Sequence, residues 1–476
     1  MKFKILMGSK AIENLKLALT IALFASMLAL FVFFAEIKLG SLGIPDISAS
    51  NGVPSDKMWI FSGGSYRTSA NESDSPYIFP CSITFRSSSA TSSVSRQKSI
   101  IINVYKDLVQ YVSEVLSQRY VCEKAEYDEY AQLLKSGNYT IINYDSDISA
   151  YILRLYCERG ADGFYSGGAF SIKKLLLTGN ENERLIAYAV NSKNEVVRFS
   201  PLNDAYATAY PINSAVISAY NNSKILVPSV LAFETDFFAS RQNVAADIAF
   251  GSDMQFYEAG ISNPLEFINQ LTAEDSLIKN DRILSILKSF KINTGLVRHY
   301  TDANVIYFVE SSASLAMSGD GYITYNGENG GIPLSKILER DGTDFSVADK
   351  LTAAITLIGG FSNNIVGGGG EIKLSSVSYD ATSDTTKFEF TYSYDSIPVY
   401  GLDKITLEIG KSSVVRAHIP TYSFYRNSVR RVSLISPEVA FSATDIPDDK
   451  YVNDYKIGYV VSAGGSTATV GWIAVT

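Results

Sequence analysis

The hydrophobic residues of this chain form one long unbroken run near the N-terminus and many short periodic segments after it. The run covers residues 17–35 and contains no charged residue. A stretch of about 20 apolar residues crosses the hydrocarbon core of a bilayer as a helix. No second run of this kind follows. The pattern therefore predicts a single membrane-spanning helix close to the N-terminus.

The charges around this run predict its orientation. Positive residues concentrate on the cytoplasmic side of a membrane helix. The short segment before the run contains Glu13 and four lysines, while Glu36 and Lys38 after it cancel. We expect a cell-membrane protein with a cytoplasmic N-terminus and its bulk outside the cytoplasm. The alternative is a cleaved secretory signal, but such signals have a shorter apolar region and a small-residue cleavage site, which the ending FVFFAEIK lacks. The four lysines are Lys2, Lys4, Lys10 and Lys16.

Small residues recur along one face of the predicted membrane helix. They follow a spacing of four, three and four positions, which keeps them on the same side of a helix. In lipid, helices associate by close packing, and small residues let two backbones approach. We therefore predict a helix-association face here. Its members are Ala18, Ala22, Ala25, Ser26 and Ala29.

Beyond the apolar run, the pattern alternates between helical and strand-like periods and predicts an α+β fold with antiparallel sheets and packed helices. Changes in composition suggest the boundaries of a multidomain exterior. The predicted segments are a cytoplasmic tail (1–16), the membrane helix (17–35), a linker (36–57), a first α+β domain (58–200), a mixed middle domain (201–320) and a C-terminal α+β domain (321–476).

Individual elements follow from periodicity and from turn residues. A helical period of 3.6 or a strand period of two assigns each segment, and Gly, Asn, Asp or Ser clusters end it. Predicted helices are 99–118, 126–134 ending at Gly137, 264–271, 276–291 and 346–359 ending at Gly359-Gly360. Predicted strands are 139–142, 151–156, 184–190, 195–199, 224–227, 305–309, 372–379, 386–394, 405–409 and 414–419. Predicted hairpins lie at 321–334, at the turn 380–384 and at 456–475.

Composition limits the function more than it defines it. The chain has 476 residues, of which 46% are hydrophobic and 19% charged, so large apolar cores are available. The formal net charge is −8. This value argues against a nucleic-acid partner, which would need a basic face.

Three cysteines, Cys81, Cys122 and Cys157, are too few and odd in number for a disulfide framework. We expect three buried thiols, with one bridge plus a free thiol as the alternative. Scarce cysteine in an exported domain is more typical of a bacterial exterior than of a eukaryotic secretory lumen.

Motifs of covalent catalysis are weak in this chain. The pattern Ser-x-x-Lys occurs four times, but its required partner occurs only as Lys135-Ser136-Gly137, in the wrong order or too close. A Gly-x-Ser-x-Gly elbow is absent from the sequence. The sequence therefore predicts a protein that is not an enzyme, without catalytic residues. The four matches begin at Ser95, Ser171, Ser276 and Ser285.

Candidate metal and cofactor residues are equally sparse. His299 and His418 are the only histidines, and they fall in the strand-like segments LVRHY and VVRAHIP, so we interpret them as structural or surface residues rather than as a base or zinc ligands. The acidic pairs Asp145/Asp147 and Asp448/Asp449 are interpreted as solvated turns, with adventitious calcium as the alternative. The glycines at 367–370 lack the lysine and helix of a phosphate loop. We predict no metal and no cofactor.

The C-terminal region resembles a known family of regulators. The residues concerned are the helix at 346–359, the strand KFEFTYSY, the sequence Ser396-Ile397-Pro398-Val399-Tyr400, the strand Val414-Val415-Arg416-Ala417-His418 and a closing hairpin IGYVV…VGWIAV that contains Trp472. Together with the single N-terminal span, these features are similar to YycH and YycI proteins. Residues 58–320 contain no family pattern that we recognise.

The resemblance implies a function and a partner. YycH and YycI proteins are membrane-anchored accessory proteins of Gram-positive bacteria, and they restrain an essential sensor histidine kinase through their membrane helix. It implies two partners for this chain, a sensor histidine kinase and a second membrane-anchored regulator. The expected function is extracytoplasmic modulation of a two-component system. The alternative is a non-catalytic scaffold or ligand-binding protein of the cell envelope or spore coat.

Overall fold

The computed structural model describes most of the chain after residue 77. The predicted tail, membrane helix, association face and linker lie outside the described residues, so they stay predictions. All described residues belong to one unit, Ser55–Thr476. The structure describes residues 78–476 except 88–89, 95–97, 158–169, 180–183, 205–207, 209–224, 242, 252–254, 272–279, 311–312, 328–329, 366–369, 445, 448–449 and 463–464.

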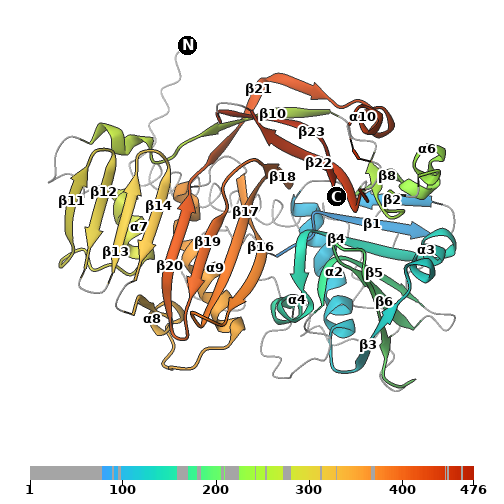
Figure 1. Cartoon of the computed structure of the whole chain (residues 1–476), viewed down its shortest axis with the longest axis horizontal. Helices are drawn as coiled ribbons and strands as arrows, with labels where there is room; N and C mark the ends of the chain where they lie inside the picture. The colour runs from blue at the N-terminus through green and yellow to red at the C-terminus, as the bar shows by residue number, and fades with distance from the viewer. Residues whose placement is uncertain are drawn as a thin grey trace, which may run out of the picture. The chain divides into compact units, whose positions relative to one another are not determined.

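The first half of the described chain forms a nine-stranded antiparallel sheet (Figure 1). Its spatial order is β3-β7-β6-β5-β4-β1-β2-β8-β9. The strands are β1 Ser82–Ser87, β2 Ala90–Val94, β3 Tyr120–Ala125, β4 Tyr139–Ser149, β5 Ser171–Gly179, β6 Leu185–Val190, β7 Val196–Pro201, β8 Leu226–Leu231 and β9 Ala249–Gly251.

Both faces of this sheet are covered at its centre. The strands β5 and β6 are buried along almost their whole length, which explains the apolar sequence of β6 and of residues 175–177 in β5. Alternate residues enter different cores: Leu175 and Leu177 pack in one core with α2, while Leu176 packs in another with α3. The helices of this half are α2 Lys98–Val115, α3 Tyr127–Ser136, α4 Ala150–Cys157, the 3-10 helix η4 Ala232–Glu234 and α6 Asp236–Ala239.

The second half of the described chain forms a fourteen-stranded mixed sheet, and among its described strands only β18 and β22 pair in parallel. Its main order is β11-β12-β13-β14-β20-β19-β17-β18-β22-β23-β10-β21, with β15 on β20 and β16 on β17. The first strands are β10 Gln255–Ser262, β11 Arg298–Asp302, β12 Val305–Val309, β13 Ser314–Ser318, β14 Tyr322–Asn326 and β15 Ile332–Pro333. The later strands are β16 Gly370–Asp380, β17 Thr385–Tyr394, β18 Ile397–Tyr400, β19 Ile405–Ile409, β20 Ser413–Pro420, β21 Ser423–Ser433, β22 Asp454–Val461 and β23 Thr467–Val475.

Helices cover one face of this second sheet. The longest, α9 Val347–Ile365, packs against α7, α8 and β17 and buries Leu351, Leu357, Ile358 and Phe361. Phe361 stacks on Phe290 at the end of α7 with ring centroids 5.7 Å apart. The remaining helices are the 3-10 helix η5 Glu266–Gln270, α7 Asp281–Ser289, α8 Leu334–Leu338 and α10 Pro437–Ala443.

The α+β class with antiparallel sheets is confirmed, and most predicted elements are present. Gly137 follows α3 as predicted, Asp380 accepts the Thr382 amide in the predicted turn, and β22 pairs with β23 as the predicted terminal hairpin. Elements of the predicted middle region, 201–320, are shared between the two sheets. Among the helices of the described residues, none is long and apolar enough to cross a bilayer.

One predicted strand is a helix. Residues 151–156 include two tyrosines and one isoleucine, residue types that favour extended structure. They belong instead to α4, whose residues Ala150, Leu153 and Cys157 are fully buried at helical spacing in the main core. Burial of one helical face outweighs the local strand propensity here.

The predicted end of a helix at Gly359-Gly360 is also wrong. The helix α9 continues through both glycines to Ile365. A Cβ atom on Gly360 would lie only 2.9 Å from the hydroxyl oxygen of Ser289. Glycine therefore allows α9 to approach α7 closely, and its role is packing rather than termination.

The predicted hairpin at 321–334 does not form. The strands β14 and β15 do not pair with each other but lie one after the other along the same partner, β20. Ile323 lies opposite Ile419, and Ile332 lies opposite Val414. A long partner strand from nearly a hundred positions later in the chain, which local patterns do not reveal, decides this pairing.

Candidate functional site: a buried ion network between the sheets

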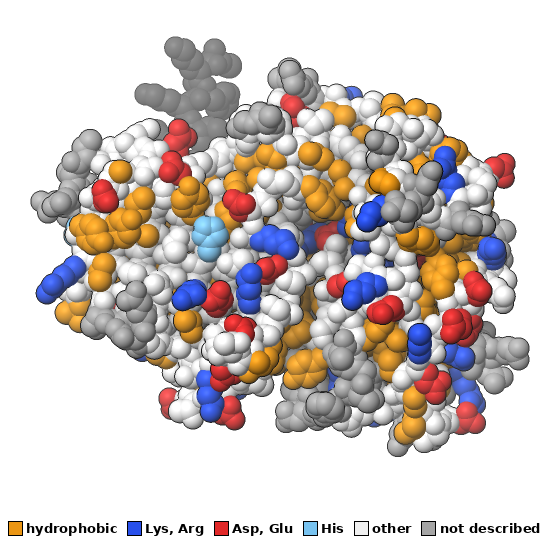
Figure 2. All heavy atoms as spheres, viewed as in Figure 1, with side chains coloured by type: hydrophobic (Ala, Val, Ile, Leu, Met, Phe, Trp, Pro, Cys, Tyr) orange, Lys and Arg blue, Asp and Glu red, His pale blue; other side chains and the backbone are white. Residues whose placement is uncertain are grey.

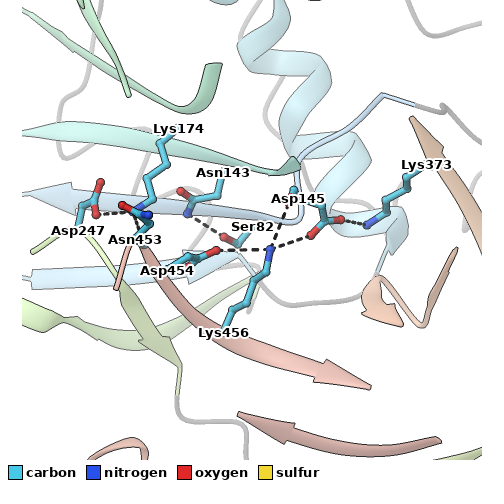
Figure 3. Close-up of polar contacts among 9 residues, drawn as sticks. All are labelled: Ser82, Asn143, Asp145, Lys174, Asp247, Lys373, Asn453, Asp454 and Lys456. Carbon is cyan, nitrogen blue, oxygen red and sulfur yellow. Dashed lines mark hydrogen bonds and ion pairs between the residues drawn. The ribbon is translucent and has the colours of Figure 1, made fainter. Parts of the chain in front are cut away.

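A network of buried lysine and aspartate side chains lies where the two sheets meet (Figure 3). Charged side chains are rarely buried unless they are paired. Three lysines and three aspartates form direct pairs here, and each of these side chains is at most 15% exposed. They are Asp145, Lys174, Asp247, Lys373, Asp454 and Lys456.

An irregularity in β4 directs Asp145 to this position. Asn143 lies opposite Lys174, but the next ladder pair joins Ile148 to Ile172. Four residues of β4 therefore face the single residue Lys173 of β5. Such bulges bend a strand and re-aim its side chains. This bulge places the carboxylate of Asp145 against strands of the second sheet.

Asp145 joins two lysines of the second sheet. The Nζ atom of Lys373 on β16 donates to its Oδ2 atom at 3.0 Å, and the Nζ atom of Lys456 on β22 lies 3.5 Å from its Oδ1 atom. Lys456 is also 3.4 Å from the carboxylate of Asp454. Positive and negative side chains therefore alternate along this branch of the network. Figure 3 shows Lys456 between its two aspartates, Asp145 and Asp454.

A second branch of the network begins at Lys174. Its Nζ atom lies 2.5 Å from the Oδ1 atom of Asp247 and donates to the backbone carbonyl of Asn453 at 3.1 Å. The hydroxyl of Tyr130 donates to the other carboxylate oxygen of Asp247 at 2.6 Å. Because Asn453 directly precedes Asp454, the two branches meet in the backbone at the start of β22.

The pKa shifts follow from burial and from these pairs. Burial alone would raise the pKa of Asp145, but Lys373 and Lys456 outweigh it and lower the pKa to about 2. Burial would lower the pKa of Lys456, but Asp454 and Asp145 raise it well above its ordinary value. Aspartates and lysines of this branch therefore stay ionised through the physiological pH range.

Two further titratable groups border the network. Burial lowers the pKa of the Lys173 amine, which is 4% exposed and has no ion-pair or hydrogen-bond partner among the described side chains. Burial, with the nearby charge of Asp145, raises the pKa of the Cys81 thiol to about 12. A thiol with such a pKa is almost entirely protonated near neutral pH, so it is a poor nucleophile.

The arrangement favours one relative position of the two sheets over others. A buried ion pair gives little net stability compared with a hydrophobic pair, but loss of one partner leaves an uncompensated charge. Apolar contacts accompany it: the ring of Trp472 on β23 lies 5.9 Å from that of Phe250 on β9. The charged side chains add specific lysine–aspartate pairs to this apolar contact between the sheets.

The structure corrects the interpretation of one candidate residue and shows that the other candidates do not lie together in one site. Asp145 is not a solvated turn residue but a buried ion-pair partner, because the bulge inserts it between the sheets. Asp147 accepts from the amide and hydroxyl of Ser192. His299 is on β11 and His418 on β20, as predicted, and neither belongs to the network. Asp448 and Asp449 lie outside the described residues.

The Ser-x-x-Lys matches do not assemble a site where the structure describes them fully. Ser171 and Lys174 are on strand β5, where residues three apart point to opposite faces. Ser285 and Lys288 are on helix α7, with Lys288 exposed. The other two matches include residues outside the described part. Within the described ranges, His, Cys, Asp and Glu side chains form no group of three or more that could hold a metal ion.

The three cysteines are free thiols. Cys157 is buried as expected, whereas Cys81 and Cys122 are only partly buried. The Cys157 sulfur lies 4.0 Å from the hydroxyl of Tyr105 in the main core.

Sequence reasoning missed most of the network. The signal that it overlooked is Lys173-Lys174 within the otherwise apolar strand β5, because lysine is almost never buried without a partner. The partners themselves were not predictable, since Lys373 and Lys456 lie 228 and 311 positions from Asp145.

Comparison with known proteins identifies no relative of this chain. No family model, curated protein or solved structure matches the chain significantly.

Proposed function

We propose that this chain is a membrane-anchored regulatory protein that modulates a two-component sensor histidine kinase. Its membrane helix and its outer part would both contact the kinase or a second membrane-anchored regulator. The proposal combines the predicted helix at residues 17–35 with the resemblance of residues 346–476 to YycH and YycI proteins.

Among the described residues, the observation that supports a regulatory role is the ion network between the two sheets. Regulation requires an element with two arrangements and a partner that binds one of them better. Interfaces within a chain that contain many polar groups are the usual places for relative movement. The junction has this character, since Asp145 of β4 pairs with lysines of β16 and β22, and Lys174 of β5 donates to the backbone carbonyl just before β22. A partner that binds one sheet can shift the docking of the other.

The membrane helix provides the first test. The full-length protein is reconstituted in vesicles with the candidate kinase, and kinase autophosphorylation is measured. Ala22→Leu with Ala25→Leu adds bulk to the predicted association face, so we expect loss of kinase binding and modulation. The control pair, Leu19→Ile with Leu23→Ile, keeps that face unchanged and should behave as wild type. Normal modulation by the Ala-to-Leu variant would show that the helix is only an anchor.

The junction provides the second test in the same assay. Lys373→Met removes one of the two positive charges that pair with Asp145, while Lys373→Arg keeps that charge. We expect modulation to be lost in the first variant and largely kept in the second. Thermal unfolding of both variants separates loss of modulation from loss of folding. Equal modulation by the Met variant and wild type would contradict a regulatory role of the junction.

A groove on the second sheet favours the alternative of ligand binding. It has a volume of about 640 Å³ and lies between the β16–β17 turn and the β19–β20 turn. Charges of both signs line it, among them Asp380, Asp384, Lys387, Lys411 and Arg416. A polar small molecule fits this chemistry. A rise in unfolding temperature with such a ligand, absent from the Lys411→Ala variant, would support this alternative.

A further inference from the structure

The strand β11 is an open edge of the second sheet. Among the described strands it pairs only with β12, and it is the outermost strand in Figure 1. An open edge presents unpaired backbone groups to another chain. Its sequence is Arg-His-Tyr-Thr-Asp, and all residues except the half-buried His299 are exposed.

Apolar and aromatic side chains are exposed at this edge. Leu296, just before β11, is 77% exposed, and Tyr300 at the centre of the strand is 50% exposed. The ring of Tyr300 stacks on that of Tyr307 on β12, with centroids 4.8 Å apart. Figure 2 shows hydrophobic side chains gathered on the face over β11 and β12. Solvent-exposed apolar surface beside an open edge is typical of a contact site.

Opposite charges stand at the two ends of the strand. Arg298 and Asp302 are both exposed, and neither has an ion-pair partner among the described residues. Four positions of extended chain separate them by about 13 Å, so they cannot pair with each other. Both point to the same face as Tyr300, because side chains alternate along a strand.

This strand is complementary to itself in the antiparallel direction. A second β11 that is rotated by a two-fold axis through Tyr300 places Arg298 opposite Asp302 of the second copy, and the reverse. Tyr300 then faces Tyr300 of the second copy. A parallel alignment would instead place like charges opposite each other, which is unfavourable. The charges therefore select one orientation.

The backbone of β11 is suited to this pairing. Asp302 and Val305 close a two-residue turn, in which Ala303 has a positive φ of 51°. The closing pair of such a hairpin is hydrogen-bonded. Because bonded pairs alternate along an antiparallel ladder, Thr301 directs its backbone groups away from β12. These groups meet their counterparts when Tyr300 pairs with itself.

We propose that β11 is the contact between two copies of this chain, joined edge to edge into a continuous sheet across a two-fold axis. Each interface then contains two Arg298–Asp302 pairs and a row of four tyrosines, Tyr307 and Tyr300 from each copy. An isologous contact of this kind closes at two copies and does not propagate into fibres. This self-association is independent of the identity of the proposed kinase partner.

Cysteine cross-linking of the full-length protein in membranes tests the contact. In the antiparallel alignment the two Tyr300 residues form a non-hydrogen-bonded pair, with Cα atoms about 4.5 Å apart, within reach of a disulfide. Tyr300→Cys should therefore give a disulfide-linked species of twice the chain mass on mild oxidation. Tyr322→Cys is the control, because it is 41% exposed on the same sheet but lies on β14. The wild-type chain gives the background from its own three cysteines.

Charge reversal tests the orientation in the Tyr300→Cys chain. Arg298→Asp alone turns both cross-strand pairs into like charges, as does Asp302→Arg alone. Each should lower the dimer affinity by about tenfold. The double variant Arg298→Asp with Asp302→Arg restores opposite charges, and cross-linking should return to the parent level.

Three results would overturn the proposal. The first is cross-linking of Tyr300→Cys no greater than that of Tyr322→Cys. The second is that the double variant Arg298→Asp with Asp302→Arg folds, with wild-type circular dichroism, but does not recover the parent level of cross-linking. The third is a cross-linked product whose mass requires a different protein, because the edge would then serve another partner.

Discussion

Two carboxylates of this protein, Asp145 and Glu389, each contact two lysines and each have a pKa lowered to about 2. Asp145 lies between two sheets, and its partners Lys373 and Lys456 are 4% and 14% exposed. Glu389 lies on β17 and is itself 20% exposed, while its partners Lys387 and Lys404 are 41% and 49% exposed. The same pKa therefore arises in two different environments.

The causes of the two shifts differ. At Asp145, burial opposes ionisation and the two lysine charges must outweigh it. At Glu389, the hydrogen bond from Lys387 is the leading cause, and Lys404 and Ser376 add to it. An exposed pair contributes about 0–1 kcal/mol, whereas removal of one partner from a buried pair costs about 3–5 kcal/mol. A pKa value alone thus does not reveal how much the fold depends on a group.

The largest expected effect is that of Asp145→Asn. The substitution leaves Lys373 without its nearest counter-charge in a buried position, and we expect a loss of about 3–5 kcal/mol in the free energy of unfolding. Urea denaturation measures this loss. The matched control, Glu389→Gln, should lose less than about 1 kcal/mol. Equal losses in the two variants would remove the distinction between the environments.

A smaller effect is expected from pH. Asp145 and Glu389 have folded-state pKa values of about 2, below their ordinary values of 3.8 and 4.5. Their contribution to stability is therefore complete above about pH 5 and is lost as the pH falls towards 2. For Asp145 the shift corresponds to roughly 2 kcal/mol. The stability difference between wild type and Asp145→Asn should shrink by this amount between pH 5 and pH 2. A stability difference that stays constant with pH would contradict the lowered pKa of Asp145 in the folded state.

Removal of both members of a buried pair should cost less than removal of one. In Asp145→Leu with Lys373→Met, no isolated charge remains at this pair, and we expect recovery of at least about 1 kcal/mol relative to Asp145→Leu alone. A double-mutant cycle by urea denaturation measures the coupling. Additive losses would indicate that the two residues act independently.

The smallest effect concerns salt. Mobile ions screen exposed charges, and the Debye length is about 3 Å at 1 M salt. The small loss caused by Glu389→Gln should therefore vanish when denaturation is repeated in 1 M sodium chloride. The loss caused by Asp145→Asn should persist, since its partners are buried. Disappearance of both losses would show that the junction is open to solvent ions.

Local patterns in the sequence determined many elements of this protein. The periodicity of α2, the glycine after α3, the polar turn between β16 and β17 and the closing hairpin all depend on neighbouring residues. Such features are readable because turns and helical faces are set within a few positions. The α+β class follows from them.

Tertiary structure decided the rest. Burial turned residues 150–157 into a helix, close packing against Ser289 kept Gly360 inside α9, and β20 aligned β14 and β15 in place of a hairpin. The candidate site shows this most clearly, because Asp145 meets lysines 228 and 311 positions away. The physical reason is that a charge is stable inside a protein only beside its counter-charge. That neighbour is set by how two sheets dock, and no local pattern encodes it.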